Sequence, residues 1–266
     1  MRRLRRLVNK RSLRWSEGVC VLEGPDLVGA ALESDAEFEA IFVDAAGGSS
    51  SEIVTVLDAA RVRGVRIFTL APGVIEKVAD AQTPQSLLAT VRLPLVALSD
   101  VTVSGLVIVL HDLRDPGNAG TIVRSADAAG VTAVVFTGQS VDPFNPKTLR
   151  ASAGSVFHVP VCVSGLDETV AYLSGGGART FATVVRGGES YRSVDLTGPT
   201  AVVIGNEASG LDEASADKCG GRLSIPMTGR SESLNAGVAA SLIAFEAFNQ
   251  RQDTPVSPAP RSLEGS

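Results

Sequence analysis

Residues 106–138, LVIVLHDLRDPGNAGTIVRSADAAGVTAVVFTG, contain the pattern that decides the fold. Two apolar runs, LVIVLHDL and TAVVFTG, flank a polar turn and a helix-like segment rich in small residues. Continuous apolar runs of this length are typical of strands buried on both faces of a parallel sheet. Proline near the start and glycine at the end are typical of a helix between them. The stretch therefore predicts a strand–helix–strand unit of a doubly wound α/β sheet.

The same alternation continues on both sides of this unit. Towards the C-terminus we expect strands over 156–163, 179–185, 200–207 and 221–227, and helices over 145–154, 166–174 and 232–250. Towards the N-terminus we expect a smaller α/β unit, with strands over 19–24, 39–44 and 65–70 and helices over 25–34 and 51–64. The predicted domains are thus 1–95 and 105–250, with a linker over 96–104 and a Pro/Ser-rich, disordered tail over 251–266.

Composition narrows the class of protein. The chain has 266 residues, of which 44% are hydrophobic, as in a globular protein with a core. It contains no apolar run of membrane-spanning length and no apolar signal core after its basic start, so we expect a cytoplasmic protein without a membrane partner. The three cysteines and two histidines show no metal-ligand spacing, so we expect no metal, buried cysteines and structural roles for His111 and His158.

The charge is distributed unevenly along the chain. The net charge is −5, but residues 1–14 contain no acid, and residues 15–266 carry 17 basic and 29 acidic side chains. A basic arm on an acidic body can bind phosphate. A solvated terminal helix would show the same pattern, so the charge alone leaves both interpretations open. The candidate RNA-binding side chains of this arm are Arg2, Arg3, Arg5, Arg6, Lys10, Arg11 and Arg14.

Three polar loops follow predicted strands in the larger domain. They are RDPGNAG (114–120), GNEASGL (205–211) and PMTGRSESLNAG (226–237). Ligands of doubly wound sheets bind beyond the carboxyl ends of the strands, so we expect the loops to meet there, with the small residues 119–121 admitting a nucleotide. Turns and helix caps explain any single loop, but three together favour a site. Neither GxxxxGK[ST] nor GxGxxG occurs in them, which argues against an ATPase or an ordinary NAD enzyme.

These loops also carry a family resemblance. NAGTIVR (118–124), GNEASGL (205–211) and IPMTGRSESLNAGVAAS (225–241) resemble, in order and spacing, the three motifs of the SpoU/TrmH branch of the SPOUT methyltransferases. NPKTLRASAGSVFHVPV (145–161) is similar to the family's intermediate segment, and VLEGPDLVGAAL (21–32) resembles part of its ribosomal-protein-like RNA-binding domain. The resemblance implies methyl transfer from S-adenosylmethionine to a ribose 2′-hydroxyl of rRNA or tRNA, with large-subunit rRNA favoured, a C-terminal trefoil knot and a homodimer.

The resemblance also implies roles for single residues. Arg124 matches the catalytic arginine and Asn118 its companion, while Glu207 matches the acidic residue of the second motif, which we expect to orient Asn or Arg side chains. Ser233 and Asn235 match catalytic-site residues of the third motif. The implied cofactor-binding residues are Gly205, Ile225 and Leu234, with Thr137 and Gly138 as further candidates at another strand end.

The role of Arg124 stays open at this stage. Guanidinium holds its proton at ordinary pH, so Arg124 is either deprotonated in a special setting or, as we favour, stays charged and stabilises the developing alkoxide. Two other functions compete with methyl transfer: a non-catalytic RNA-binding protein of the same fold and an enzyme with a small-molecule substrate. The intact motif residues argue against the first, and the N-terminal domain with its basic arm argues against the second.

Overall fold

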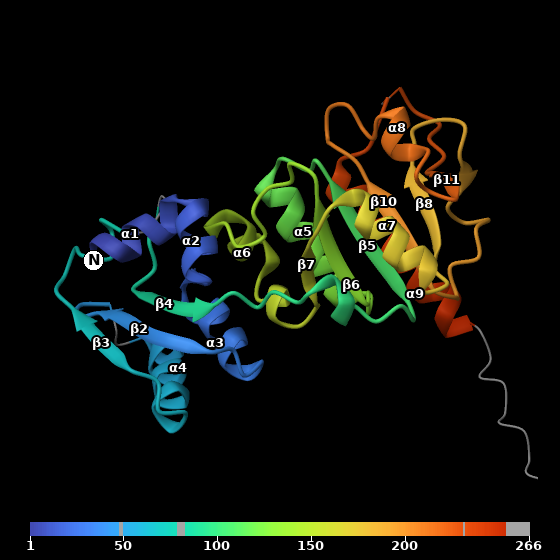
Figure 1. Ribbon diagram of the computed structural model, residues 1–266. Helices are drawn as coiled ribbons and strands as arrows, with labels where there is room; N and C mark the ends of the chain where they lie inside the picture. Colours follow the sequence, from blue (N-terminus) through green and yellow to red (C-terminus); the bar gives the residue numbers. More distant parts are fainter. Residues whose placement is uncertain (48–49, 79–82, 231, 254–266) are drawn as a thin grey trace, which may run out of the picture.

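The computed structural model describes residues 1–47, 50–78, 83–230 and 232–253, and it shows two β-sheets, each with its own helices (Figure 1). The first sheet ends at Arg92 and the second begins at Leu106. The stretch between them includes one 3-10 turn, η1 (Leu98–Asp100). The C-terminal helix continues to Asp253, past the point where the tail was expected to begin, and residues 254–266 lie outside the described part of the chain.

The smaller sheet has the strand order β1-β4-β2-β3. Its elements are β1 (Val19–Glu23), α3 (Pro25–Glu33), β2 (Phe38–Asp44), α4 (Ser51–Val62), β3 (Ile67–Leu70) and β4 (Leu87–Arg92). The sequence reasoning missed β4, which pairs antiparallel with both β1 and β2 and so holds the centre of the sheet. Helices α3 and α4, which the alternation predicted, pack on one face of this sheet.

The basic arm is folded into this domain. It forms α1 (Arg2–Asn9) and α2 (Arg11–Glu17), and it buries Leu4, Leu7 and Val8 against strands β1 and β4 on the face opposite α3 and α4. The apolar side chains of α1 therefore fix it to the sheet, while most of its arginines point outward.

The larger sheet is parallel throughout, with the strand order β7-β6-β5-β10-β8-β11-β9. Its strands are β5 (Leu106–His111), β6 (Ala133–Thr137), β7 (Val161–Val163), β8 (Arg179–Thr183), β9 (Glu189–Ser190), β10 (Thr200–Ile204) and β11 (Gly221–Ser224). The chain runs outward from β5 through β6 to β7, crosses to β8 and the edge strand β9, and then returns to β10 beside β5 before it forms β11. The switch point lies between the central strands β5 and β10. This confirms the predicted fold class, a doubly wound α/β sheet with a smaller N-terminal domain.

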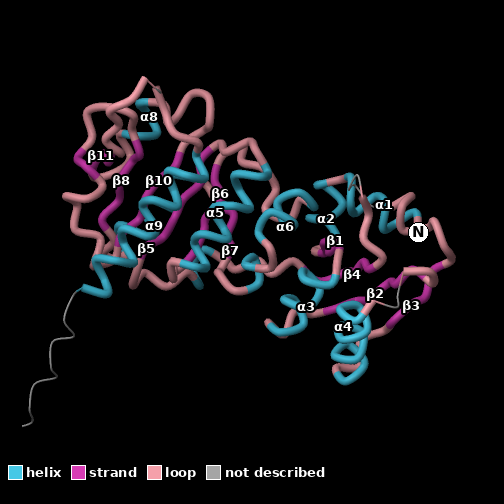
Figure 2. Tube along the Cα trace, turned by 180° about the vertical axis from the view of Figure 1, so that it is seen from behind, coloured by secondary structure: helices cyan, strands magenta, loops and turns pink. Residues whose placement is uncertain are grey.

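Helices cover both faces of this sheet. They are α5 (Pro116–Ala128), α6 (Pro146–Ser152), α7 (Leu166–Gly175), α8 (Glu213–Ala216) and α9 (Ala236–Asp253). Helices α5 and α9 lie side by side on one face (Figure 2), and α7 covers the other. The alternate residues of β5 divide accordingly: Ile108 joins the core under α5 and α9, and Val109 joins the core under α7.

The small residues of α5 have a different purpose from the one expected. Asp115 caps the helix by accepting a hydrogen bond from the Asn118 amide at 2.7 Å, and Pro116 occupies the first turn. Ala119 and Gly120 are buried, and Gly120 faces the backbone of α6. Their size therefore serves helix packing, and the expectation that a nucleotide approaches them is wrong for these two residues, while Thr121 is exposed.

The segment after α6 also differs from its prediction. Residues 156–163 were expected to form one strand, but the chain forms a 3-10 turn, η2 (Ser155–Phe157), and pairs only at β7. Ala153 and Gly154 both adopt left-handed conformations, with φ of 49° and 94°, so the chain turns sharply after α6, and Pro160 has no amide hydrogen to donate. His158 therefore lies outside the strand, where its Nδ1 is 3.2 Å from the carboxylate of Asp127.

Candidate active site

The three motif loops meet at the switch point, and Glu207 holds them together. Its Oε1 accepts hydrogen bonds from the Asp115 amide at 2.9 Å and the Asn118 side chain at 3.1 Å. Its Oε2 accepts one from the Arg114 amide at 3.1 Å. The loop after β10 is thus tied to the loop after β5, as expected for a carboxylate that orients an asparagine.

Asn118 continues this network to the third loop. Its Oδ1 accepts a hydrogen bond from the Asn235 side chain at 2.8 Å. Asn235 in turn caps α9, because its Oδ1 accepts from the amide of Gly237 at 2.8 Å. The structure therefore brings together Glu207, Asn118 and Asn235 from three segments that are far apart in the sequence.

The environment of Glu207 keeps it ionised. Partial burial raises the pKa of this carboxyl, but hydrogen bonds from the Asn118 side chain and from the backbone of Asp115 and Arg114 outweigh burial. The net pKa therefore lies below the ordinary glutamate value, and the carboxylate is a permanent acceptor at neutral pH. An acceptor-only group in this position fixes the Asn118 amide with its NH₂ towards Glu207 and its oxygen towards Asn235.

A cavity of about 500 Å³ opens beside this network. Its walls include the predicted cofactor residues Gly205, Ile225 and Leu234, together with Glu207 and Ser233. A cavity of this size suits a nucleoside-sized ligand.

The cavity fits S-adenosylmethionine chemically. Apolar walls from Ile204, Leu223 and Met227 can pack against a flat base, and the described lining also contains the charged groups Arg186, Glu207 and Glu232, which can face the charged amino-acid end. Sequence reasoning missed Arg186 and Glu232. Arg186 follows β8 and Glu232 immediately precedes the matched Ser233, so their positions after a strand and inside the third motif were the available signals.

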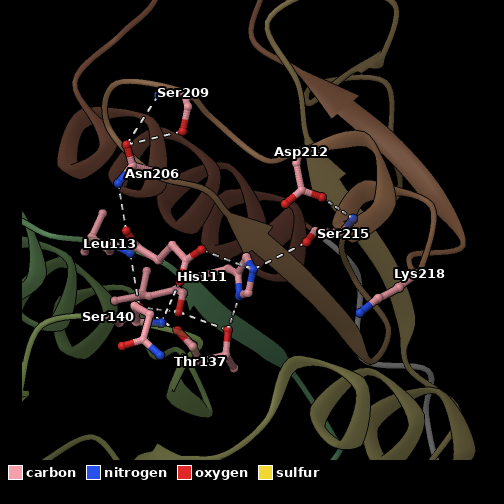
Figure 3. A network of polar contacts seen from close by, with 12 residues as sticks. His111, Leu113, Thr137, Ser140, Asn206, Ser209, Asp212, Ser215 and Lys218 are labelled. Carbon is pink, nitrogen blue, oxygen red and sulfur yellow. Dashed lines mark hydrogen bonds and ion pairs between the residues drawn. The ribbon is translucent and has the colours of Figure 1, made fainter.

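Thr137 and Gly138 are placed elsewhere. Neither is among the described residues that line the cavity. Thr137 is buried, with its hydroxyl 2.9 Å from Nδ1 of His111 and donating to the Leu110 carbonyl (Figure 3). Gly138 has a positive φ of 64°, and a Cβ there would meet His111 and Asp112. Both residues shape the turn after β6, which explains their occurrence without a cofactor.

Two residues that sequence reasoning did not single out, Asp112 after β5 and Asn206 after β10, lie beside the network around Glu207. Asp112 has a left-handed backbone, with φ of 56°, and its carbonyl accepts a hydrogen bond from the Asn206 side chain at 2.8 Å. Asn206 lies in the tight turn that its backbone forms with Gly210. The Asn206 side chain (Figure 3) thus joins the loops after β5 and β10 a second time. A left-handed aspartate carries strain that the surrounding contacts must hold.

Arg124 lies apart from the amide network. It is exposed on α5, is not among the described residues that line the cavity, and forms no hydrogen bond or ion pair within the described part of the chain. Its neighbours on the helix face α9, since the Ser125 hydroxyl accepts a hydrogen bond from Ser241 at 2.7 Å. Arg124 therefore flanks the contact between α5 and α9, with its guanidinium available.

The basic arm supplies fewer free cations than expected. Arg14 is buried and paired with Asp142, so its expected contact with RNA gives way to a structural role. Arg3 pairs with Glu17 and Glu39, and Arg11 donates to the carbonyl of Ser140 at 3.3 Å. The exposed members whose side chains have neither an ion pair nor a hydrogen bond among the described residues are Arg2, Arg5, Arg6 and Lys10.

The described residues contain no group of three or more His, Cys, Asp and Glu side chains placed to hold a metal ion. Among the helices of the described residues, none combines the length and the apolar character that crossing a bilayer requires.

Comparison with known proteins agrees with this geometry. Residues 105–245 match the model of the SpoU rRNA Methylase family, and residues 1–89 match that of the MRM3-like substrate binding domain. The 23S rRNA (guanosine(2553)-2′-O)-methyltransferase RlmP of Bacillus subtilis (strain 168) is 33% identical over 232 residues, which cover 87% of this chain and 89% of the relative.

Solved structures extend the likeness to both domains. The SpoU methyltransferase AviRb from Streptomyces viridochromogenes, in complex with the cofactor AdoMet, superposes with a TM-score of 0.86 and 28% identity, over 95% of this chain and 97% of that one. An AdoMet-bound rRNA methyltransferase from Sinorhizobium meliloti gives a TM-score of 0.82 and 28% identity, over 93% of each chain.

A parallel sheet with an asparagine–carboxylate network at its switch point and a nucleoside-sized cavity beside it defines, with these relatives, an RNA methyltransferase. The chain belongs to the SpoU rRNA methylase family. The predicted family resemblance and the predicted enzyme class are thereby confirmed.

Proposed function

We propose that this enzyme transfers a methyl group from S-adenosylmethionine to a ribose 2′-hydroxyl of 23S rRNA in the cytoplasm. The observation that carries the proposal is the bonded set Glu207, Asn118 and Asn235, which stands beside a cavity that suits the methyl donor. The RlmP relative, which matches along most of both chains, supports rRNA rather than tRNA as the substrate.

The residues of the site have complementary tasks in this reaction. The bound cofactor supplies a methyl group already activated on a sulfonium cation. Asn118, Ser233 and Asn235 position the ribose so that its 2′-oxygen is in line with that methyl group, which is catalysis by proximity. Glu207 acts through Asn118 and is a positioning residue. Arg124 stays protonated and stabilises the negative charge that develops on the 2′-oxygen.

The proposal includes a homodimer, because Arg124 lies outside the cavity of its own chain. Helix α9 exposes a stripe of large apolar side chains on one face: Val238, Leu242, Phe245 and Phe248. Spacings of three and four residues place them in line, as at helix–helix interfaces. A second copy that docks on α9 covers this stripe and brings the nearby Arg124 to a cavity. The C-terminal knot implied by the family resemblance belongs to the same proposal.

The free cations of α1 contact RNA phosphates in this proposal. Arg2, Arg5 and Arg6 lie on this helix and Lys10 directly follows it, and the apolar side of the helix is fixed to the first domain. Such contacts supply affinity without base specificity, so RNA binding weakens as salt rises.

Methyl transfer to unmodified rRNA tests the function. The purified protein is incubated with labelled S-adenosylmethionine and either 23S rRNA or tRNA, and 2′-O-methyl positions are mapped by resistance to alkaline cleavage. We expect label in 23S rRNA, loss of label in Arg124→Ala and normal transfer in Arg61→Ala, which removes an exposed arginine of α4. Label in tRNA alone would correct the substrate, and no label in any RNA would refute the proposed function.

The dimer is tested by its mass in solution. Phe245→Glu places a charge in the α9 stripe, and we expect it to shift the protein to a monomer in light scattering and to abolish methyl transfer. Val62→Glu is the matched control, since Val62 is an apolar side chain of α4 that is 89% exposed. A wild-type monomer with full activity would refute the shared site.

A further inference from the structure

A buried ion pair joins the two domains. Arg14 of α2 donates from Nε and Nη2 to Oδ2 of Asp142, at 2.8 and 2.6 Å, and both side chains are only 3% exposed. The remaining donor group of Arg14, Nη1, bonds to the carbonyls of Leu7 and Val8 at the end of α1. One guanidinium thus links α1, α2 and the methyltransferase domain.

Further contacts surround this pair. Trp15 donates from Nε1 to Oδ1 of Asp142 at 3.2 Å, and its ring packs against Phe144. Arg150 of α6 donates to Glu23 of β1 at 3.1 Å, and that carboxylate is 6% exposed. In Figure 1, α6 accordingly lies directly between the two sheets. Movement of one domain along the other would separate these ion pairs and leave a buried charge without its partner, which is energetically costly. The pairs therefore hold the two domains in one relative position.

The Asp142 segment also leads to the active site. Two residues earlier, the Ser140 hydroxyl accepts a hydrogen bond from the Leu113 amide at 3.1 Å (Figure 3). The next two amides of the chain, those of Arg114 and Asp115, bind Glu207. A path of hydrogen bonds and short backbone segments therefore runs from Arg14 in the first domain to Glu207 and its partner Asn118.

We propose that Arg14 and Asp142 are positioning residues that dock the first domain rigidly, so that the cations of α1 stand at a fixed distance from the methyl-transfer site. The inference rests on the proposed function and deepens it. A rigid pair of domains selects an RNA that presents its phosphates and its target ribose at matching separation. A long folded RNA can meet both positions at once, whereas a short fragment meets only the catalytic one.

Asp142→Asn is the sharpest test, because the two oxygens of Asp142 have separate partners. Oδ1 accepts from Trp15 and from the Phe144 amide, and among the described residues Oδ2 accepts only from Arg14. The asparagine keeps the first set and places an NH₂ group against the guanidinium. Glu23→Gln is the second variant, since it breaks the bond to Arg150 in the same way. Glu39→Gln is the matched control, because it loses an arginine contact within the first domain.

Three measurements are made on each full-length variant. X-ray scattering gives the size of the particle, calorimetry gives the Kd for S-adenosylmethionine, and single-turnover assays give the methylation rate on intact 23S rRNA and on a short fragment that contains the target nucleotide. For Asp142→Asn we expect a larger radius of gyration, an unchanged cofactor Kd, an unchanged rate on the fragment and a rate on intact rRNA that falls about 10- to 100-fold. Glu23→Gln changes in the same direction, and Glu39→Gln matches the wild type.

Two results would overturn the proposal. One is an unchanged radius and an unchanged rate on intact rRNA in both docking variants. The other is an equal loss on both RNAs with weaker cofactor binding, which would mean that Asp142 only supports the fold of the site. If the wild type methylates no RNA, the proposed function falls, while the scattering data still decide whether the pair docks the domains.

Discussion

Gly120→Ala should destabilise the protein although alanine is the better helix former. A Cβ at position 120 would lie 2.4 Å from the Cβ of Ala151, 2.5 Å from the carbonyl oxygen of Thr148 and 2.8 Å from the amide nitrogen of Ser152. Two of these three atoms are backbone atoms of α6, so no side-chain rotation can relieve the contact. Non-bonded atoms prefer separations of about 3.5 to 4.0 Å, so the two helices must separate by about 1 Å.

The change in the free energy of unfolding caused by Gly120→Ala is the sum of two opposing effects. Overpacking of a core typically costs about 1–3 kcal/mol, and the backbone contacts place this case at about 3 kcal/mol. Replacement of a glycine inside a helix returns about 1 kcal/mol. The net destabilisation is therefore about 2 kcal/mol, which lowers the melting temperature by roughly 4–8 °C in a protein of this size.

The control is the same substitution in a different helix. Gly29 lies inside α3, and a Cβ there has its nearest neighbour, a methyl group of Val56, at 3.8 Å. Gly29→Ala should therefore stabilise the protein by about 0.5–1 kcal/mol. Urea unfolding followed by circular dichroism measures both variants. A Gly120→Ala protein as stable as Gly29→Ala would show that α5 and α6 are not in the close contact described above.

Three further predictions concern the site and the thiols. Glu207→Gln keeps one acceptor oxygen but places an NH₂ group against a backbone N–H. We expect it to lower the free energy of unfolding by about 1–2 kcal/mol at pH 7, measured by urea unfolding. The lowered pKa of Glu207 means that this contribution is full above the ordinary pKa of about 4.3 and is lost as the pH falls through the lower folded value, so the two proteins should converge in acid. Asn235→Ala removes the cap of α9 and the donor to Asn118, so it should lower the free energy of unfolding by about 1 kcal/mol and slow methyl transfer. A loss of stability with an unchanged methylation rate would show that Asn235 only caps the helix. Cys20 and Cys162 are buried, and burial raises the pKa of Cys20 to about 12 and that of Cys162 to about 11, whereas Cys219 is partly exposed. An alkylating reagent at pH 7.5 should therefore label Cys20 and Cys162 only in the unfolded protein, and rapid labelling of either in the native protein would contradict that burial.

The sequence predicted best those elements that local pattern controls. Strands β5, β6 and β10 are continuous apolar runs, and α5 carries its own start signal in Asp115 and Pro116, so each follows from neighbouring residues. Strand β4 was missed although Leu87–Arg92 is apolar, because a simple alternation of strands and helices leaves no place for an antiparallel strand at the centre.

In the site, too, features set by the local sequence could be predicted, whereas features set by contacts between distant residues could not. Three strand-end loops could be expected to meet, and the bonds from Glu207 and Asn235 to Asn118 place them together. The burial of Arg14 could not be predicted, since its partner Asp142 is 128 residues away and the surrounding arginines are exposed. Thr137 also follows a strand, but its hydroxyl is already used by His111, which only the packing of neighbouring strands decides.

The pairing of β5 with β10 has a consequence for synthesis of the chain. These central strands are roughly 90 residues apart in sequence, and at 5–20 residues per second β10 leaves the ribosome about 5–20 s after β5. During that interval β5 can pair with β6, but its other edge offers unpaired backbone groups along the apolar run Leu106–His111. The nascent chain therefore exposes an apolar strand edge that can pair with other chains and aggregate. We expect the yield of newly made enzyme to depend on how well this edge is protected until β10 is synthesised.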